Sequence, residues 1–112
     1  MKTHREKRQT DRQMCSDFIS LAWADQNGRR LSDTGLLEDV SPGGVCVSMK
    51  LPVGVGYTVY LHTRGFEGEA EVRYCNLGEY GYLVGLEFIN GTGWDQEKWR
   101  PKHLLEVVGP TA

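Results

Sequence analysis

Polar and apolar side chains alternate through the middle of the chain. The clearest stretch is residues 67–74, in which charged residues alternate with glycine, apolar or aromatic residues. Successive side chains of a β-strand point to opposite faces, so this period of two predicts a strand with one solvated and one buried face. The charged positions, including Glu69 and Glu71, are expected in solvent. Val72 and Tyr74 are expected in the core.

Five further segments have the composition of strands. They are separated by turn-forming residues, of which Asn27-Gly28 is a strong hairpin signal. Gly35 is a candidate interruption within the second segment. The expected strands cover roughly residues 15–24, 29–40, 45–50, 57–61 and 82–88. Six short strands joined by tight turns predict a mainly β fold, a six-stranded antiparallel β-barrel. A barrel of this size has little room inside for a ligand, so the binding surface is expected on its outside.

The last part of the chain has a different pattern. Residues 95–108 carry apolar side chains at helical spacing, and they predict a C-terminal helix that covers one open end of the barrel, with Pro101 as a break. Trp94 and Trp99 are expected to anchor this helix to the barrel. The resulting division is a flexible basic arm at 1–13, a barrel at 14–90, and a C-terminal helical segment and tail at 91–112.

Charge is divided unevenly along the 112 residues. The net charge is −2, but residues 1–13 hold five basic and two acidic residues, a net +3, which leaves −5 on the rest. The arm has few apolar groups, so we expect it to be flexible until a partner orders it. A body of −5 argues against a long nucleic acid, because a bound strand needs a continuous positive track.

Several classes of function find no support in the residues. Cys15, Cys46 and Cys75 are widely spaced, with no CxxC pair and no Cys/His cluster, so neither a zinc site nor a disulfide framework is expected. No nucleophile–base pair suggests catalysis. The N-terminus lacks the apolar segment of a secretory signal, and no apolar run approaches the roughly 18 residues that cross a bilayer. We therefore expect a cytoplasmic protein without catalytic residues, metal, cofactor or membrane insertion.

Two short motifs flank the first two expected strands. Arg8 and Arg12 form an RxxxR motif in the basic arm, and residues 39–44 fit [DN]xSxxG at the corner between the second and third strands. Each motif alone has a plain explanation, since basic tails aid solubility and Asp or Ser often braces a turn. Their order, and their separation of about 27 residues, make the combination much more specific.

With these motifs, the chain resembles the PilZ domain family over roughly residues 7–90. The resemblance extends to the segments Gly43-Gly44-Val45-Cys46-Val47, Leu51-Pro52-Val53-Gly54, Glu71-Val72-Arg73-Tyr74 and Gly81-Tyr82-Leu83-Val84-Gly85-Leu86-Glu87-Phe88. It implies a six-stranded β-barrel that acts in the bacterial cytoplasm as a receptor for the second messenger cyclic di-GMP. The implied ligand contacts are Arg8, Arg12, Asp39, Ser41, Gly43 and Gly44. In some relatives an aromatic residue at the Tyr74 position lies near the ligand.

The chemistry of these residues suits that ligand, which has two phosphates and two guanines. An arginine fork can bind guanine O6 and N7 together or grip a phosphate, and the Asp39 carboxylate can accept from a guanine N–H edge. Ser41 can donate to a phosphate or brace the turn, and Gly44 allows a positive φ or a close backbone approach. Asp11 could pair with Arg12 and so compete with the ligand. Lys7 directly precedes Arg8, and a lysine at this position is compatible with binding either one ligand molecule or an intercalated pair.

We expect the arm to fold across the barrel when the dinucleotide binds, which would present a changed surface to a downstream protein partner. Two other functions remain open from the sequence. One is a PilZ-like adaptor that binds no nucleotide and acts through protein contacts. The other is a small barrel that binds single-stranded nucleic acid through the arm and its aromatic residues.

Overall fold

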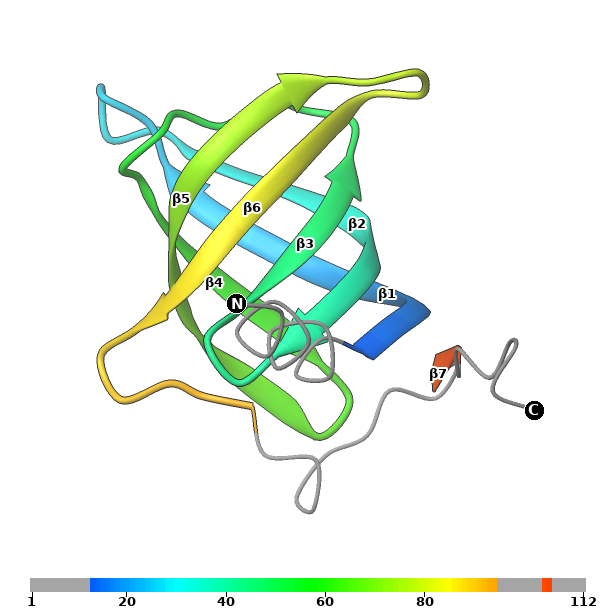
Figure 1. Cartoon of the computed structure of the whole chain (residues 1–112). Helices are drawn as coiled ribbons and strands as arrows, with labels where there is room; N and C mark the ends of the chain where they lie inside the picture. Colours follow the sequence, from blue (N-terminus) through cyan, green and yellow to red (C-terminus); the bar gives the residue numbers. More distant parts are fainter. Residues whose placement is uncertain (1–12, 95–103, 106–112) are drawn as a thin grey trace, which may run out of the picture.

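Six antiparallel strands close into a β-barrel (Figure 1). The computed structural model describes residues 13–94 and 104–105, with side chains from Asp17 to Trp94. The strands are β1 (Gln13–Ala24), β2 (Arg30–Ser41), β3 (Gly44–Met49), β4 (Thr58–Thr63), β5 (Phe66–Leu77) and β6 (Tyr82–Ile89). Their order is β2-β3-β6-β5-β4-β1, and pairing of β1 with β2 closes the ring. The predicted mainly β fold and six-stranded antiparallel barrel are confirmed.

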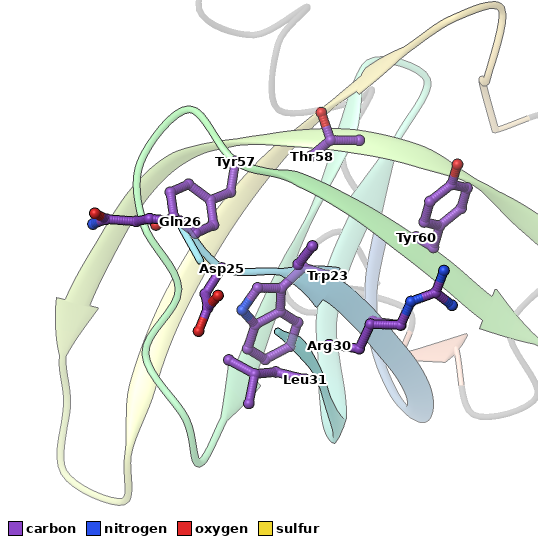
Figure 2. A pocket seen from close by; sticks show the side chains of 10 residues that line it. Trp23, Asp25, Gln26, Arg30, Leu31, Tyr57, Thr58 and Tyr60 are labelled. Carbon is purple, nitrogen blue, oxygen red and sulfur yellow. The ribbon is translucent and has the colours of Figure 1, made fainter. Parts of the chain in front are cut away.

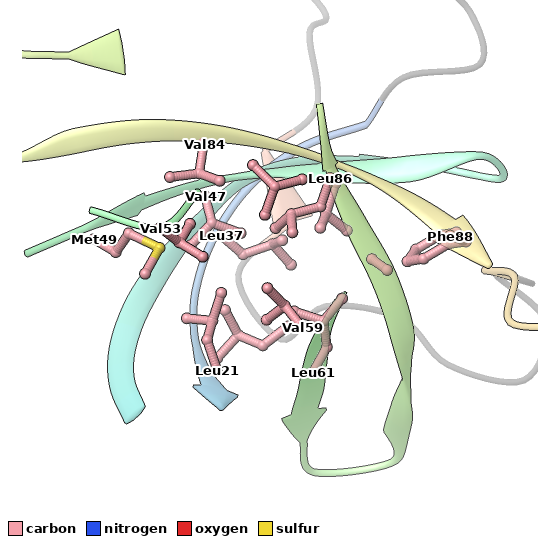
Figure 3. Packing of buried hydrophobic residues seen from close by; sticks show 14 of the residues in the cluster. Leu21, Leu37, Val47, Met49, Val53, Val59, Leu61, Val84, Leu86 and Phe88 are labelled. Carbon is pink, nitrogen blue, oxygen red and sulfur yellow. The ribbon is translucent and has the colours of Figure 1, made fainter. Parts of the chain in front are cut away.

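Apolar side chains from all six strands meet inside the barrel (Figure 3). Strand alternation supplies them, because every second residue points inward. The fully buried large side chains are Ile19, Leu21, Leu37, Val40, Val47, Val59, Leu61, Val72 and Val84. No polar or charged side chain is buried among the described residues, so the interior is held together by apolar packing.

The β1–β2 hairpin is long, and its turn is braced by one side chain. Asp25 Oδ1 accepts the backbone N–H groups of Asn27 and Arg29, at 2.9 and 2.8 Å. Gly28 takes a positive φ of 81°, which the turn requires and glycine allows at little cost. The expected interruption near Gly35 is wrong, since β2 continues through it. Glycine is needed there because a Cβ would collide with the Val47 side chain on β3.

The register is irregular at three places, one of them in β1 between Met14 and Asp17, and the irregularities in β2 and β5 change which residues face outward. In β2 the register with β3 shifts between Leu37 and Asp39, and in β5 the register with β6 shifts between Val72 and Tyr74. An extra residue in one strand interrupts the alternation of faces. The prediction that Tyr74 lies in the core with Val72 is therefore wrong: Tyr74 is 40% exposed on the outer face.

The predicted C-terminal helix is not confirmed. Leu104 and Leu105 form a short strand, β7 (Leu104–Leu105), which pairs with Met14 and Cys15 at the start of β1. An open strand edge offers backbone hydrogen bonds that can outweigh a helical side-chain pattern. The rest of the predicted helix, including Trp99, lies outside the described residues. Trp94 packs in the core, and the helix that it was predicted to anchor is not confirmed.

The part of the chain that the structure describes has no helix with the length and apolar character of a membrane span.

Candidate functional site

The [DN]xSxxG motif forms the tight corner between β2 and β3. Ser41 is paired with Gly44, so Pro42 and Gly43 are the two loop residues. Ser41 Oγ donates to the Gly44 carbonyl oxygen at 3.4 Å. The Gly43 carbonyl oxygen accepts the backbone N–H of Phe88 on β6, at 2.9 Å. The corner is thus fixed both within itself and to the neighbouring strand.

The two glycines of the corner differ in what they do. A Cβ on Gly44 would collide with the carbonyl oxygen of Leu86 on β6, whereas a Cβ on Gly43 would meet nothing within 4 Å. Neither has a positive φ in the left-handed region. Of the two roles predicted for Gly44, close backbone approach is therefore the one observed.

A row of four residues crosses the outer face of the barrel beside this corner. Asp39 on β2 is opposite Cys46 on β3, Cys46 is opposite Gly85 on β6, and Gly85 is opposite Tyr74 on β5. Opposed residues in a sheet share a face, and adjacent strands are about 4.8 Å apart, so Asp39 and Gly85 are separated by about 10 Å. The half-buried Asp39 and the Tyr74 ring, which lies over Gly85, are therefore about two strand spacings apart.

The Tyr74 ring lies directly over Gly85. A Cβ at Gly85 would collide with the ring, and the Tyr74 hydroxyl oxygen is 3.6 Å from the sulfur of Cys46. The ring therefore covers the backbone of β6 and shields Cys46, which is 8% exposed although it faces outward. Glycine at position 85 is what lets the ring lie flat against the sheet.

Carboxylates dominate the charge around the row. Glu38 accepts from Ser48 Oγ at 2.7 Å. Glu71 and Glu87 both pair with Arg73, which donates through Nε to Glu87 and lies 3.5 Å from Glu71 through Nη1. With Asp39, these residues place four acidic groups and one cation around the row. An anion bound here would need cations from elsewhere in the chain.

The two motif arginines, Arg8 and Arg12, lie outside the described residues. The start of β1 is described, and it runs beside the corner: Gln13 pairs with Val40, one residue before Ser41. Gln13 directly follows Arg12 in the sequence. The structure thus brings together Asp39, Ser41, Gly43 and Gly44, and it brings the first described residue of the chain beside them.

Sequence reasoning missed three members of this site. Cys46 and Gly85 were not assigned to it, and Tyr74 was expected in the core. The signal for Gly85 was available, because a glycine inside a strand often marks a close approach. The outward position of Tyr74 depends on the bulge after Val72, which simple alternation does not reveal.

A second hydrogen-bonded cluster lies on the outer face of β4 and β5. The hydrogen bond from Tyr60 lowers the pKa of the Glu69 carboxyl, helped by Asn90 Nδ2, which donates to Glu69 Oε1 at 2.7 Å. The same hydrogen bond and the charge of Glu69 raise the pKa of Tyr60, while nearby Arg30 opposes that rise. The described residues contain no group of three or more His, Cys, Asp or Glu that could hold a metal ion.

A sizeable pocket lies away from the motif corner. It has a volume of about 720 Å³ and is lined by the end of β1, the β1–β2 turn and the start of β4 (Figure 2). At the motif corner, by comparison, Pro42 and Gly43 are exposed, and Ser41 and Gly44 are half-buried.

Comparison with known proteins gave no relative: no family model, no curated protein and no solved structure matches the chain.

Proposed function

We propose that this protein is a non-catalytic receptor for cyclic di-GMP, a role in which Arg8, Arg12 and the β2–β3 corner hold the dinucleotide. The observation that carries the proposal is the row of Asp39, Cys46, Gly85 and Tyr74 beside the motif corner. It combines a hydrogen-bond acceptor for a guanine N–H edge with an aromatic ring for stacking, at a separation of about 10 Å.

The charge distribution supports a clamp with two sides. The described outer face is acidic around the row, so it offers a guanine acceptors but offers a phosphate little attraction. The arm has a net charge of +3, and the ligand is a dianion. In this proposal the arginines bind phosphate or guanine O6/N7, and the barrel binds the base edges and ring faces. Neither side would be sufficient alone.

The position of Gln13 supports the same arrangement. Because Gln13 pairs with Val40, the first described residue of the chain lies beside Ser41. Consecutive Cα atoms are 3.8 Å apart, so an arginine at position 12 is covalently within reach of the corner. In the proposed mechanism, binding holds residues 5–13 against the barrel and so changes the surface offered to a downstream protein.

Calorimetry with cyclic di-GMP tests the proposal. We expect binding by the wild type and near-complete loss in Arg8→Ala and in Arg12→Ala. The matched control is Arg29→Ala, which removes the same charge from the exposed turn at the far end of the β1–β2 hairpin and should bind as the wild type does. Micromolar binding that neither arginine substitution changes would refute this site. A wild type that gives no heat would refute the receptor function.

One further ligand and two further variants sharpen the result. Cyclic di-AMP lacks the guanine O6 and N–H edge, so it should bind at least about tenfold more weakly, as each good bidentate base contact provides about 1–3 kcal/mol of discrimination. Tyr74→Phe keeps the ring and should bind nearly normally. Tyr74→Ala should weaken binding about tenfold or more, because base stacking on an aromatic ring contributes about 1–3 kcal/mol.

The second candidate is a PilZ-like adaptor that binds no nucleotide. The observation in its favour is the β5–β6 hairpin, where Leu77 and Tyr80 are 78% and 90% exposed. Exposed apolar groups gathered in one place are typical of protein contacts. A wild type without affinity for cyclic di-GMP would favour this function. Single-stranded nucleic acid is distinguished by salt, since its affinity falls steeply with ionic strength over many phosphate contacts.

A further inference from the structure

The barrel opens along one seam, between β1 and β4. These strands are paired only through Ser20–His62, Leu21–Leu61 and Ala22–Tyr60. Continuing the register would pair Ala24 with Thr58, but the ladder ends before that point. Beyond Ala22 the two strands share no further residue pair, and residues from both line the pocket of about 720 Å³ (Figure 2). We call it the seam pocket, lined by residues 22–26, Arg30, Leu31, Tyr57, Thr58 and Tyr60.

The floor of the seam pocket is aromatic and apolar. Trp23 is 5% exposed and belongs to the core cluster, and Leu31 and Tyr57 are half-buried and pack against that cluster. Three exposed residues of the two strands are small, namely Ala22, Ala24 and Thr58, while the large exposed Tyr60 lies at the last ladder pair. Small side chains above a large aromatic floor leave an open volume. That volume lies within the roughly 300–1,000 Å³ typical of small-molecule sites.

The charged groups at the rim are not equivalent. Asp25 already accepts two backbone N–H groups through Oδ1, so its negative charge is partly neutralised within the turn. Arg30 lies near Tyr60 at the other side of Trp23 (Figure 2), and among the described residues it forms no ion pair. The Tyr60 hydroxyl is engaged with Glu69. The rim therefore has one guanidinium with donors to spare, beside an aromatic floor.

We propose that the seam pocket binds a small molecule with a flat apolar body and one negatively charged group, such as an aromatic carboxylate. The body lies on Trp23 and Tyr57, and the carboxylate receives a two-pronged hydrogen bond from Arg30.

This site is separate from the motif corner. The corner lies beside Gln13 and the seam pocket beside Trp23, at opposite ends of β1. Ten residues of strand span about 33 Å. One small ligand cannot contact both sites, so binding in the seam pocket does not depend on the proposed binding of cyclic di-GMP.

The test is an amide chemical-shift titration of the full chain with 2-naphthoate, in the absence of any nucleotide. Two probes of the same shape accompany it, the neutral 2-naphthalenemethanol and the cationic 2-naphthylmethylammonium. We expect saturable shifts confined to residues 22–31 and 57–60, with naphthoate binding about tenfold more tightly than the alcohol and the ammonium probe binding most weakly. Shifts scattered over the surface, or none at millimolar naphthoate, would overturn the proposal.

Two pairs of variants locate the contacts. Arg30→Gln should weaken naphthoate about tenfold and leave the alcohol unchanged, and the neighbouring Arg29→Gln, outside the lining, should change neither. Thr58→Trp fills the pocket and should abolish binding of both probes, whereas His62→Trp, an exposed residue further along the same face of β4, should not. A dispersed amide spectrum confirms that each variant is folded. Equal naphthoate affinity in Arg30→Gln and wild type would overturn the charge assignment, and unchanged binding in Thr58→Trp would overturn the location.

Discussion

The two ends of the β1–β2 hairpin differ in how tightly their surroundings are paired. Beside the motif corner, β3 and β6 are paired over all six residues of β3, and glycine at positions 44 and 85 lets strand and ring approach closely. At the other end, β1 and β4 share only three residue pairs. A fully paired wall presents a surface, so a ligand there needs additional groups from the chain termini. A ladder that ends early forms a pocket within the barrel wall itself.

The largest expected difference between the two regions is in the cost of a core cavity. Leu37 on β2 is paired with β1 and β3, whereas Leu61 on β4 is paired with β5 and, through the ladder of only three pairs, with β1; both are fully buried. Leucine-to-alanine substitutions in cores cost about 2–5 kcal/mol, and less where the surroundings can collapse. We expect about 4 kcal/mol for Leu37→Ala and about 2–3 kcal/mol for Leu61→Ala in urea unfolding. A larger cost at Leu61 would contradict a looser seam.

The next effect tests the tight side alone. Gly44→Ala forces a methyl group against the Leu86 carbonyl oxygen, so we expect a loss of about 1–3 kcal/mol in the free energy of unfolding. Gly43→Ala, one residue away in the same corner, meets open space and should stay within about 0.5 kcal/mol of wild type. Similar losses for the two variants would show that the corner's backbone, rather than the approach of β6, limits substitution there.

Hydrogen exchange compares the two ladders without any substitution. The amides that bond β1 to β4 lie in a ladder of three pairs next to an open pocket, whereas those between β3 and β6 lie in a continuous ladder. Local opening is easier where fewer neighbouring bonds must break. We expect at least about tenfold faster exchange in the β1–β4 ladder, equivalent to about 1.4 kcal/mol. Equal protection would mean that the seam opens only with the whole barrel.

The smallest effect concerns Tyr60, in the last residue pair of the seam. Its hydrogen bond is the main cause of the lowered pKa of Glu69, so Tyr60→Phe should raise that pKa toward its ordinary value, as measured by carbon-detected NMR titration. A carboxyl with a lowered pKa stabilises the fold above its ordinary pKa, and this contribution is lost as the pH falls through the folded value. The stability difference between wild type and Tyr60→Phe should therefore shrink on acidification. An unchanged Glu69 pKa would assign the shift to Asn90.

The sequence predicted the barrel because the decisive information was local. Alternation along β5 and β6 placed Val72 and Val84 in the core, and the Asn27-Gly28 turn indicated the first hairpin. The bulge before Tyr74 could not be predicted in this way, because an extra residue leaves no mark on composition and reverses the face of the residues after it. At Leu104, local helical spacing lost to pairing with a distant strand edge.

The motif corner and the seam pocket also differ in how far the sequence predicts them. Asp39, Ser41, Gly43 and Gly44 are close together in sequence, so a motif could identify them, and the structure places them at one corner. The seam pocket joins residues near position 23 with residues near position 58. The pocket forms where the β1–β4 ladder ends, which depends on two distant segments together. No short sequence pattern in either segment predicts it.

The Tyr74 ring on β5 fills the space in which a side chain at position 85 on β6 would lie. Neither position can vary freely, since a larger residue at 85 has room only if the ring at 74 moves away or is lost. In a lineage descended from this chain, the two positions should therefore change together or not at all. That linkage offers a way to recognise distant descendants of this barrel, because a paired aromatic and glycine can persist after the surrounding apolar residues have been exchanged.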